Sequence, residues 1–572
     1  MQRRKRIAII GGGPSGLFMF KSILNSGQQG ISIDIFEKGD RLGAGMPYSS
    51  CGSNVEHVTN VSGNEIPELL QPLDEWIKTL PSSTLEAFDI DVAHFNDFKV
   101  VPRLLFGSYL EDQFNGFLSK AKLADLPTKV HYNKKVTDII DGDSHTVVEL
   151  NETLYEEFDV VIICTGHHWL SIHERERRYF DSPYPPSKLS SIINHSIAIT
   201  GSSLTAIDAI RTLARNNGKF YKGDDNTLVY VVDKNSPDFH IVLHSRHGLL
   251  PAVRFHLEDS HLGKNLVLAP SQISEHMTEN NGFLSLDYIF ENDFKKPMRA
   301  KDPVFYDRIK DLDMEGFVTL MMDLREQADP FLLFKSEYWE ANKSIKNKES
   351  ISWKEMLAIL SFAMNYPAKH FSAEDMIRLQ HVLMPLISIV IAFVPQSSCE
   401  ELIALHEAGR LDIVSVGSDS RIEYVNHGVV YNYPNSKGEN VQKKFDAYIN
   451  CTGQVHLSIA SFPFQSLVKS ERVSQAKLKF RKPEHAEDFL SSGRDGIRYH
   501  AGEYYMDVPG LTINDCFQAV NTHGDASERI FIMAVPYIAG FNPDYSGLDF
   551  CEEASGRIAN ALLKQPSWNC TV

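Results

Sequence analysis

A glycine-rich turn near the start of the chain places the strongest limit on its fold. The segment RIAIIGGGPSGLFMF, residues 6–20, joins a short apolar run to a run with helical spacing. This pattern predicts a buried strand followed by a helix. Gly11, Gly13 and Gly16 stand between them in the spacing G-x-G-x-x-G. Such spacing is typical of a unit in which the helix N-terminus binds the pyrophosphate of a dinucleotide.

The segments that follow strengthen this interpretation. The sequence ISIDIFEK, residues 31–38, predicts a second strand, and its Glu37 follows Gly16 by 21 residues. An acidic residue about 20 positions after the turn binds the ribose hydroxyl groups in dinucleotide-binding units. The polar turn GDRLGAG, residues 39–45, then ends the strand. A structural turn with a surface glutamate is the alternative, but dinucleotide binding explains more of the pattern.

A second unit of the same kind begins in the segment SIAITGSSLTAIDAI, residues 196–210. Here the turn is Gly201-x-Ser203-x-x-Ala206, so a serine and an alanine replace the second and third glycines. Both side chains are small, so a phosphate can still approach, though less closely than at glycine. One chain therefore carries two predicted nucleotide-binding units.

The residues at the ends of the two following strands predict different nucleotides. In the second unit, FHIVLHSRHG, residues 239–248, presents Ser245 and Arg246 where the 2′-phosphate of NADPH needs a hydroxyl group and a guanidinium. Glu37 at the matching place of the first unit would repel that phosphate, which favours FAD there. A solvated residue at a strand end is the alternative for Arg246.

Two further strands and a final helix connect these units. The segments FDVVIICTGHHW, residues 158–169, and FDAYINCTGQVH, residues 445–456, share Phe-Asp, an apolar run and Cys-Thr-Gly. Residues 529–563 predict a strand, a loop and an amphipathic helix. We expect the N-terminus of this helix, near Gly547 and Leu548, to meet the flavin edge that gains negative charge on reduction.

Composition excludes several other classes of protein. The chain has 572 residues, enough for two or three domains, and a net charge of −17, which argues against nucleic-acid and anionic-membrane binding. The longest apolar run, residues 382–394, is too short to span a bilayer. Seven cysteines without a C-x-x-C spacing argue against zinc ribbons and against a redox-active disulfide. We therefore expect reduced thiols and a cytoplasmic location.

The predicted fold class is α/β, with two Rossmann-like dinucleotide-binding domains, for FAD and NADPH, and a largely helical insertion. The FAD domain is predicted to comprise residues 1–190 and 445–572, and the NADPH domain residues 191–444. Helical spacing dominates about residues 255–390 within the latter. This insertion is interpreted as a lid over the substrate or, equally, as a structural or oligomerisation element.

The quoted units and four local segments within or beside them resemble a known family. These segments are VPRLLFGSYLEDQF at 101–114, TGSSLTAIDAI at 200–210, SRHGLLP at 245–251 and LHEAGRLDIV at 405–414. They resemble the FAD-NAD(P)-binding family among the flavoprotein monooxygenases with two dinucleotide domains, which includes amino-acid N-hydroxylases. The resemblance implies that NADPH reduces FAD and that a flavin hydroperoxide then oxygenates the substrate. The expected reaction is N-hydroxylation of a small amine or amino acid.

The residues predicted to bind the cofactors lie in the turns and strand ends described above. They are Gly11, Gly13, Pro14, Ser15, Gly16, Glu37, Lys38, Gly45, Arg103, Thr165, Gly166, Gly201, Ser202, Ser203, Ser245, Arg246, Thr452, Gly453, Gly547 and Leu548. Asn60, His168 and Arg254 are predicted to contact substrate. Arg103 and Arg254 are candidates for binding a carboxylate, with a structural ion pair as the alternative for Arg103. No metal site is predicted.

Two other functions fit the same motifs. One is a flavin-dependent NAD(P)H reductase or dehydrogenase that passes electrons to a partner. The other is a non-catalytic FAD- and NADP-binding sensor or assembly protein. The partners expected for the monooxygenase are O2 and a small-molecule substrate, with the oligomeric state left open. No catalytic acid–base pair stands out in the sequence.

Overall fold

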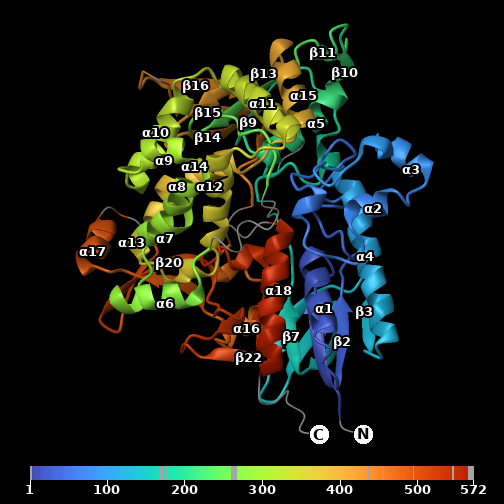
Figure 1. Cartoon of the computed structure of the whole chain (residues 1–572), viewed down its shortest axis with the longest axis vertical. Coiled ribbons are helices and arrows are strands. Elements are labelled where there is room, and N and C mark those ends of the chain that lie inside the picture. Colours follow the sequence, from blue (N-terminus) through green and yellow to red (C-terminus); the bar gives the residue numbers. More distant parts are fainter. Residues whose placement is uncertain are drawn as a thin grey trace.

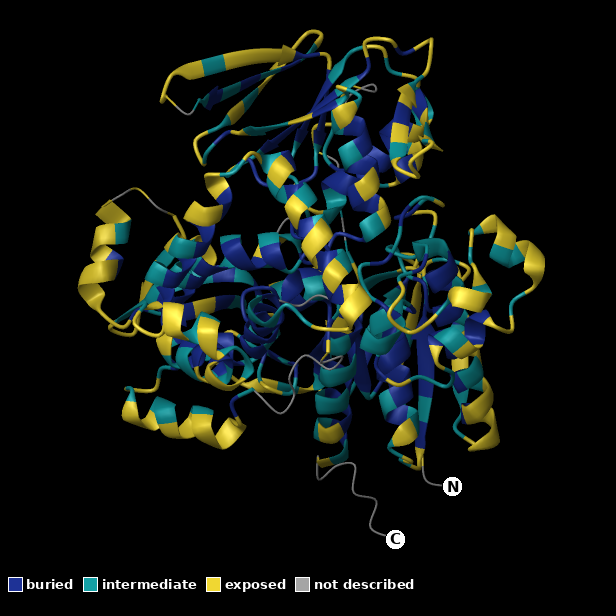
Figure 2. Ribbon diagram, turned by 45° about the horizontal axis from the view of Figure 1, so that its top comes forward, coloured by how far each residue is buried: buried dark blue, intermediate teal, exposed yellow. Residues whose placement is uncertain are grey.

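Two α/β units and a helical region make up the molecule. The computed structural model describes residues 3–167, 169, 172–174, 178–258, 267–435, 437–454, 457–491, 493, 495–543 and 547–564. The first unit lies at the lower end of Figure 1 and the second at the upper end, with most of the helices of the middle region beside them. Buried residues gather in the sheets and in the inner faces of the helices (Figure 2).

The first unit is built on a six-stranded sheet in the order β21-β22-β7-β1-β2-β3. Its strands are β1 (Lys5–Ile10), β2 (Ile31–Phe36), β3 (Thr128–His131), β7 (Val160–Ile163), β21 (Gln518–Val520) and β22 (Ala526–Ile532). Every pairing is parallel except that of β21 with β22. The central strands are apolar and buried because both faces of the sheet are covered.

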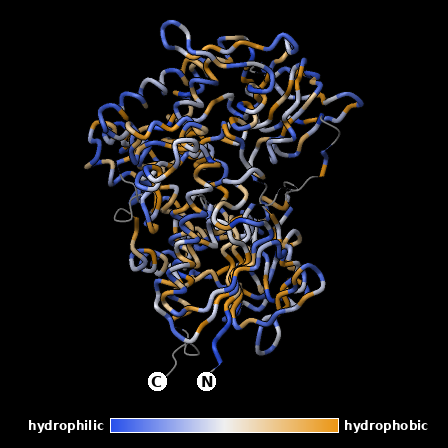
Figure 3. Tube along the Cα trace, turned by 90° about the vertical axis from the view of Figure 1, so that its right-hand side faces the viewer, coloured by the Kyte–Doolittle hydropathy of each residue, from blue (hydrophilic) through white to orange (hydrophobic). Residues whose placement is uncertain are grey.

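Helices from the two ends of the chain pack together on this sheet. They are α1 (Pro14–Asn25) and α18 (Gly547–Lys564), joined by a hydrogen bond of 2.8 Å between the hydroxyls of Ser22 and Ser555. α4 (Arg103–Leu123) packs beside α1, and a three-stranded sheet of β4 (Val136–Asp141), β5 (Thr146–Leu150) and β6 (Leu154–Phe158) precedes β7. Hydrophobic stretches of the trace concentrate in this interior (Figure 3).

The second unit repeats the parallel strand order of the first. Its sheet runs β13-β12-β9-β17-β8, all parallel, and α5 (Leu204–Asn217) follows β9. The strands are β8 (Tyr179–Phe180), β9 (Ser196–Thr200), β12 (His240–Ser245), β13 (Leu411–Ser415) and β17 (Ala447–Asn450). A three-stranded sheet again precedes the fourth strand in this order: β14 (Arg421–Val425), β15 (Gly428–Pro434) and β16 (Asn440–Phe445).

Two strands of this sheet lie outside the range predicted for the NADPH domain. β8 and β17 fall within the segments 1–190 and 445–572 assigned to the FAD domain, yet both pair in the second sheet. We therefore propose that the chain crosses between the units just after β7 and just after β17, where each Cys-Thr-Gly turn stands.

The middle region is helical, and the predicted fold class is confirmed. Its helices are α6 (Pro270–Glu279), α7 (Leu286–Ile289), α8 (Lys296–Lys301), α9 (Pro303–Ile309), α10 (Met314–Glu326), α11 (Pro330–Asn347), α12 (Ser352–Ala363), α13 (Ala373–Arg378) and α14 (Met384–Val390). π-Helical turns at Phe290–Lys295 and Leu379–Leu383 interrupt this series. None of the helices in the described part of the chain is both long and apolar enough to cross a membrane.

The remaining elements lie around these three bodies. They are α2 (Leu73–Ile77), α3 (Ser82–Ala87), the hairpin of β10 (Gly218–Lys222) and β11 (Leu228–Val232), α15 (Gln396–Glu407), α16 (Gln465–Lys469), β18 (Gln475–Lys479), α17 (Pro483–Ser491), β19 (Ile497–His500) and β20 (Glu503–Leu511). β18, β20 and β19 form an antiparallel sheet.

Candidate functional site

The first glycine turn has the geometry that its spacing predicts. Gly11 has φ +111°, and a Cβ there would lie 2.6 Å from the carbonyl oxygen of Cys164 at the end of β7. A Cβ on Gly16 would lie 2.1 Å from the carbonyl oxygen of Gly11. Glycine is therefore required at both positions by the packing of the turn against its own unit.

The N-terminus of α1 is open to an anion. Gly13 is its N-cap, Pro14 and Ser15 begin its first turn, and neither a capping side chain nor an acidic residue occupies that turn. A Cβ on Gly13 would lie 3.3 Å from Cα of Gly45, so these two glycines form a bare backbone surface beside the helix end. Unpartnered N–H groups in such a place suit a pyrophosphate.

Glu37 is held at this turn by two backbone groups. Its Oε2 accepts a hydrogen bond of 2.9 Å from Gly12 N–H, and its Oε1 accepts one of 2.7 Å from Gly39 N–H. Each oxygen keeps a lone pair, so the fixed carboxylate can still accept from ribose hydroxyl groups. The neighbouring Lys38 is exposed.

Polar groups without partners cluster where the chain leaves β7. Thr165 Oγ1, His167 Nδ1 and Trp169 Nε1 are buried and have no hydrogen-bond partner among the described residues. Gly166 lies between them and is exposed. Burial lowers the pKa of His167, which a hydrogen bond with Gln454 partly offsets. Orphaned buried groups of this kind indicate a place where a ligand supplies the partners. His168 lies outside the described residues.

The N-terminus of α18 approaches the same region. Gly547 has φ +93° and is exposed, whereas Leu548 is buried. One turn further, Cys551 Sγ lies 3.5 Å from the hydroxyl oxygen of Ser15 in the first turn of α1. Burial raises the pKa of Cys551 to about 12 and also raises the pKa of Cys164. Both thiols therefore stay protonated near neutral pH.

The second turn repeats the backbone of the first. Gly201 has φ +101°, and a Cβ there would lie 2.5 Å from the carbonyl oxygen of Cys451 at the end of β17. Ser203 is the exposed N-cap of α5, with no side-chain cap and no acidic residue in the first turn. The Ser202 hydroxyl donates to Leu249 O at 2.7 Å.

The strand ends of the second unit offer a cation and a hydroxyl. Arg246 is exposed, and its guanidinium has no partner in the part of the chain that the structure describes. The hydroxyl oxygen of Ser245 is buried without a partner among the described residues. Thr452 N–H and Oγ1 both donate to Asn450 Oδ1, and Gly453 follows with φ +95°. The residues present thus fit FAD in the first unit and NADPH in the second.

Arg103, predicted to bind a cofactor or a carboxylate, is engaged in an ion pair, the alternative that the sequence left open. Arg103 Nη1 donates to Asp208 Oδ2 at 2.5 Å, and its Nε donates to Val58 O at 3.0 Å. Tyr184 donates to the same Asp208 oxygen at 2.7 Å. Burial would raise the pKa of Asp208, but the charges of Arg103 and His57 hold it below its usual value. Arg103 at the start of α4 therefore joins the first unit to α5 of the second.

Arg254, predicted to contact the substrate, is also engaged in an ion pair. Its guanidinium pairs with Glu65 and donates to Ser62 Oγ at 2.7 Å. It donates as well to the main-chain oxygen of Asn60, another predicted substrate residue. The structure thus brings these two residues together, but as a second buried join between the units rather than as an open anion site.

Tyr366 is a candidate that the sequence did not indicate. It has φ +68° and ψ −52°, a strained backbone for a residue with a side chain. Its N–H donates to the buried Asn542 Oδ1 at 3.2 Å, and its buried hydroxyl has no partner among the described residues. The Arg557 guanidinium of α18 lies 3.9 Å from the ring centroid. Tyr366 belongs to the helical middle region and contacts the first unit only in the folded structure, so no sequence motif could indicate it.

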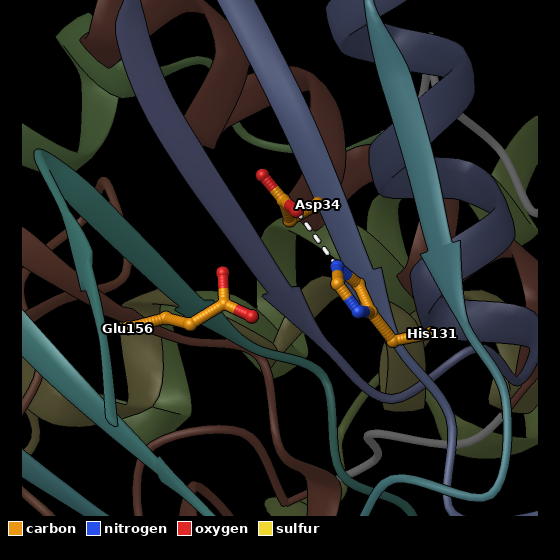
Figure 4. A group of neighbouring side chains, drawn as sticks. All are labelled: Asp34, His131 and Glu156. Atoms are coloured by element: carbon orange, nitrogen blue, oxygen red, sulfur yellow. Dashed lines mark hydrogen bonds and ion pairs between the residues drawn. The ribbon is translucent and has the colours of Figure 1, made fainter. Parts of the chain in front are cut away.

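Asp34 of β2, His131 of β3 and Glu156 of β6 lie together, with their ligand atoms within 4.8 Å of one another (Figure 4). His131 Nε2 lies 2.7 Å from Asp34 Oδ1. Arg6 Nη2 donates to Asp34 at 3.2 Å and to Glu156 at 2.9 Å. Because this guanidinium contacts both carboxylates and His131 contacts Asp34, the cluster is explained as an ion-pair network.

Two family models match this chain. Residues 8–168 match the family described as FAD-NAD(P)-binding, and residues 269–391 match the YdhS-like middle domain. The chain is 27% identical over 566 residues to the uncharacterized protein YdhS of Escherichia coli (strain K12), and the match covers 98% of each protein.

Two further similarities are more limited. Over 173 residues the chain is 31% identical to the trimethylamine monooxygenase of Roseovarius sp. (strain 217), a match to 29% of this chain and 36% of that protein. Among solved structures, the ornithine N-hydroxylase of Kutzneria sp. 744 aligns over 98% of this chain and 99% of that one. The two proteins are 12% identical, and the TM-score is 0.48.

Proposed function

We propose that this chain, a flavin oxidoreductase whose residues 8–168 match the FAD-NAD(P)-binding family, is an NADPH-consuming monooxygenase. The family match confirms the predicted FAD and NAD(P) cofactors. In the proposed reaction NADPH supplies two electrons, one atom of O2 enters the substrate, and the other leaves as water. Bound flavin supplies the electron transfer and oxygen activation.

The observation that carries this proposal is the pair of open helix ends in one chain. α1 and α5 each begin at an uncapped turn beside a Cys-Thr-Gly segment, and the buried Arg103–Asp208 pair joins α5 to the first unit. Two bound nucleotides would be held in a fixed mutual arrangement, as transfer of a hydride requires. The partial match to a trimethylamine monooxygenase supports oxygenation in particular.

The cysteines favour this function over thiol-based reduction. The six described cysteines are all free, and those beside the first turn, Cys164 and Cys551, have raised pKa values. A reductase that works through a dithiol needs an accessible thiolate. A reductase that passes electrons from the flavin to a partner without using thiols is the alternative function, and the experiments below distinguish it from a monooxygenase.

We propose further that the substrate is a small amine or amino acid oxidised at nitrogen. An unprotonated amine is a nucleophile, so the protein must position it and exclude water rather than supply an acid–base pair. Thr165, His167 and Trp169 present buried polar atoms at the end of β7 where such a substrate would meet the flavin. With Arg103 and Arg254 engaged in ion pairs, these groups replace the arginines as the proposed polar contacts.

Spectroscopy on the purified protein tests the proposal. We expect a yellow protein with FAD that NADPH bleaches without oxygen and that consumes O2 once air is admitted. A panel of amines, amino acids, ketones and thioethers is then scored by product mass and by NADPH consumption per product. A one-oxygen gain on an amine supports the proposal. Oxygen transfer only to a ketone or thioether contradicts N-hydroxylation, and bleaching without product from any substrate contradicts monooxygenation.

A further inference from the structure

A cavity of about 400 Å³ lies in the second unit, away from both glycine turns. Its floor is apolar and includes Ile197 of β9, Leu213 of α5 and Ile449 of β17. Its walls come from β8 and from the chain between residues 188 and 195. We call it the second-unit cavity. None of the residues assigned above to a nucleotide lines it.

The first unit shows how the same place is normally filled. Ile7 in the first unit matches Ile197 in the second, because each lies four residues before the first glycine of its turn. Ile23 matches Leu213 in the same way, because each lies twelve residues after that glycine. In the first unit Ala559 and Leu562 of α18 cover Ile7 and Ile23, so that a space of only about 10 Å³ remains.

The second unit has much less covering material at this position. The 18-residue helix α18 packs against α1, whereas α5 packs against the single-turn helix η3 (Pro186–Leu189). β8, the strand that takes the place of β22 in the sheet order, has two residues against seven in β22. The cavity therefore lies where the second unit lacks the long helix and long strand that cover the matching place in the first unit. Its volume lies in the range of about 300–1,000 Å³ that ligand sites occupy.

Basic side chains line the rim of the cavity. Arg178 is exposed, and its guanidinium has no partner within the described ranges. Lys188 pairs with Glu174, and its ammonium lies 5.8 Å from the Phe180 ring centroid. His195 adds a third basic group. An apolar floor below a basic rim is complementary to an anion with an apolar body.

We propose that the second-unit cavity binds a small carboxylate whose body is aliphatic or aromatic. The carboxylate would pair with Arg178 at the rim, and the apolar body would cover Ile197, Leu213 and Ile449 as α18 covers the matching residues of the first unit. This site is separate from the proposed monooxygenase reaction, because it uses neither nucleotide turn.

Calorimetric titration of the full-length protein with octanoate tests this site. The protein is loaded with FAD and saturated with NADP+, so that both nucleotide turns are filled. We expect one octanoate to bind per chain. Octylammonium, which lacks the anionic group, and acetate, which lacks the apolar body, should each bind at least about tenfold more weakly than octanoate. Absence of octanoate binding, or equal binding of octylammonium, would overturn the proposal.

Variants locate the binding. Arg178→Ala should weaken octanoate binding about tenfold through loss of a charge-assisted contact, and Ile193→Trp, which adds volume in the cavity wall, should abolish it. Ser191→Phe serves the same purpose if Ile193→Trp does not fold. Arg421→Ala, at an exposed arginine of β14, is the matched control and should change nothing. Octanoate affinity that survives Arg178→Ala and the filling variant would place binding elsewhere and contradict the site.

Discussion

The two nucleotide units share a backbone but differ in what their side chains add to it. Gly11 and Gly201 have φ values of +111° and +101°, and a Cβ on either would strike a cysteine carbonyl oxygen. The first glycine is thus demanded by the fold of each unit. At the next position of the pattern the first unit has Gly13 against Gly45, whereas the second has the exposed Ser203. The second glycine is therefore not needed for the fold of the unit, and its presence depends on the neighbouring loop and on the ligand.

A similar contrast appears at the end of the second strand. Gly11 N–H donates to Phe36 O, and Gly201 N–H donates to His244 O, so these residues occupy matching positions. Phe36 stacks on His131 with ring centroids 4.5 Å apart, and His244 stacks on Tyr431 at 4.0 Å. The two matching positions are thus both stacked on another ring, but the residue is an apolar Phe in the first unit and a titratable His in the second.

The largest effect is expected from breaking the ion pair that joins the units. Asp208→Ala leaves the buried Arg103 guanidinium without its carboxylate, and removal of one partner of a buried pair costs about 3–5 kcal/mol. The free energy of unfolding measured in urea should fall by that amount. Lys335→Ala, which breaks the exposed pair with Glu407, is the control, with an expected cost of about 0–1 kcal/mol. Equal losses for both variants would contradict a stabilising join.

Valine at the matching N-cap positions should separate the two cofactors. Gly13→Val places methyl groups against Gly45 and the pyrophosphate, so FAD affinity should fall about a hundredfold, equivalent to about 2.7 kcal/mol. Ser203→Val should keep FAD and weaken NADPH instead. Flavin absorbance per chain and NADPH titration measure the two effects. Full FAD occupancy in the Gly13→Val variant would show that FAD does not bind at this turn.

The nucleotide preference of the second unit is expected to depend on Arg246. Arg246→Ala removes the proposed partner of the 2′-phosphate, a charge-assisted contact worth about 1.5–3 kcal/mol. The KM for NADPH should therefore rise about tenfold to a hundredfold, while the KM for NADH stays nearly unchanged. Steady-state oxidation of both coenzymes provides the measurement. An equal rise for both would remove Arg246 from this role.

The smallest effect concerns acid stability. Burial lowers the pKa of His244 to about 4, with a small contribution from Lys443. Between about pH 6.5 and pH 4 the unfolded chain binds a proton that the folded chain does not, so stability falls as pH falls, by about 1.4 kcal/mol per pH unit. His244→Phe, the residue of the first unit, should flatten this slope. Urea unfolding at pH 7 and pH 5 measures it, and an unchanged slope would contradict the assignment.

Local pattern was enough to predict the strands, the turns and the helical middle region. The spacing of Gly11, Gly13 and Gly16 and the repeat around Gly201 describe contacts made within a single unit. The ion-pair partners of Arg103 and Arg254 could not be predicted, because Asp208 and Glu65 lie far away in sequence and meet these arginines only when the units dock. Tyr366 was missed for the same reason, since Asn542 lies 176 positions away.

The position of β22 has a consequence for the order in which the molecule is made. Every strand of the second sheet has been synthesised once the chain reaches Asn450, but the first sheet still lacks β22, and α1 still lacks α18. Until Ile530 pairs with Val161, β7 is an unpaired edge with apolar neighbours, and closure requires contacts of very long sequence separation. A stalled or truncated chain therefore has a complete sheet in the second unit, while the sheet of the first unit has an unpaired edge at β7 that is prone to aggregation.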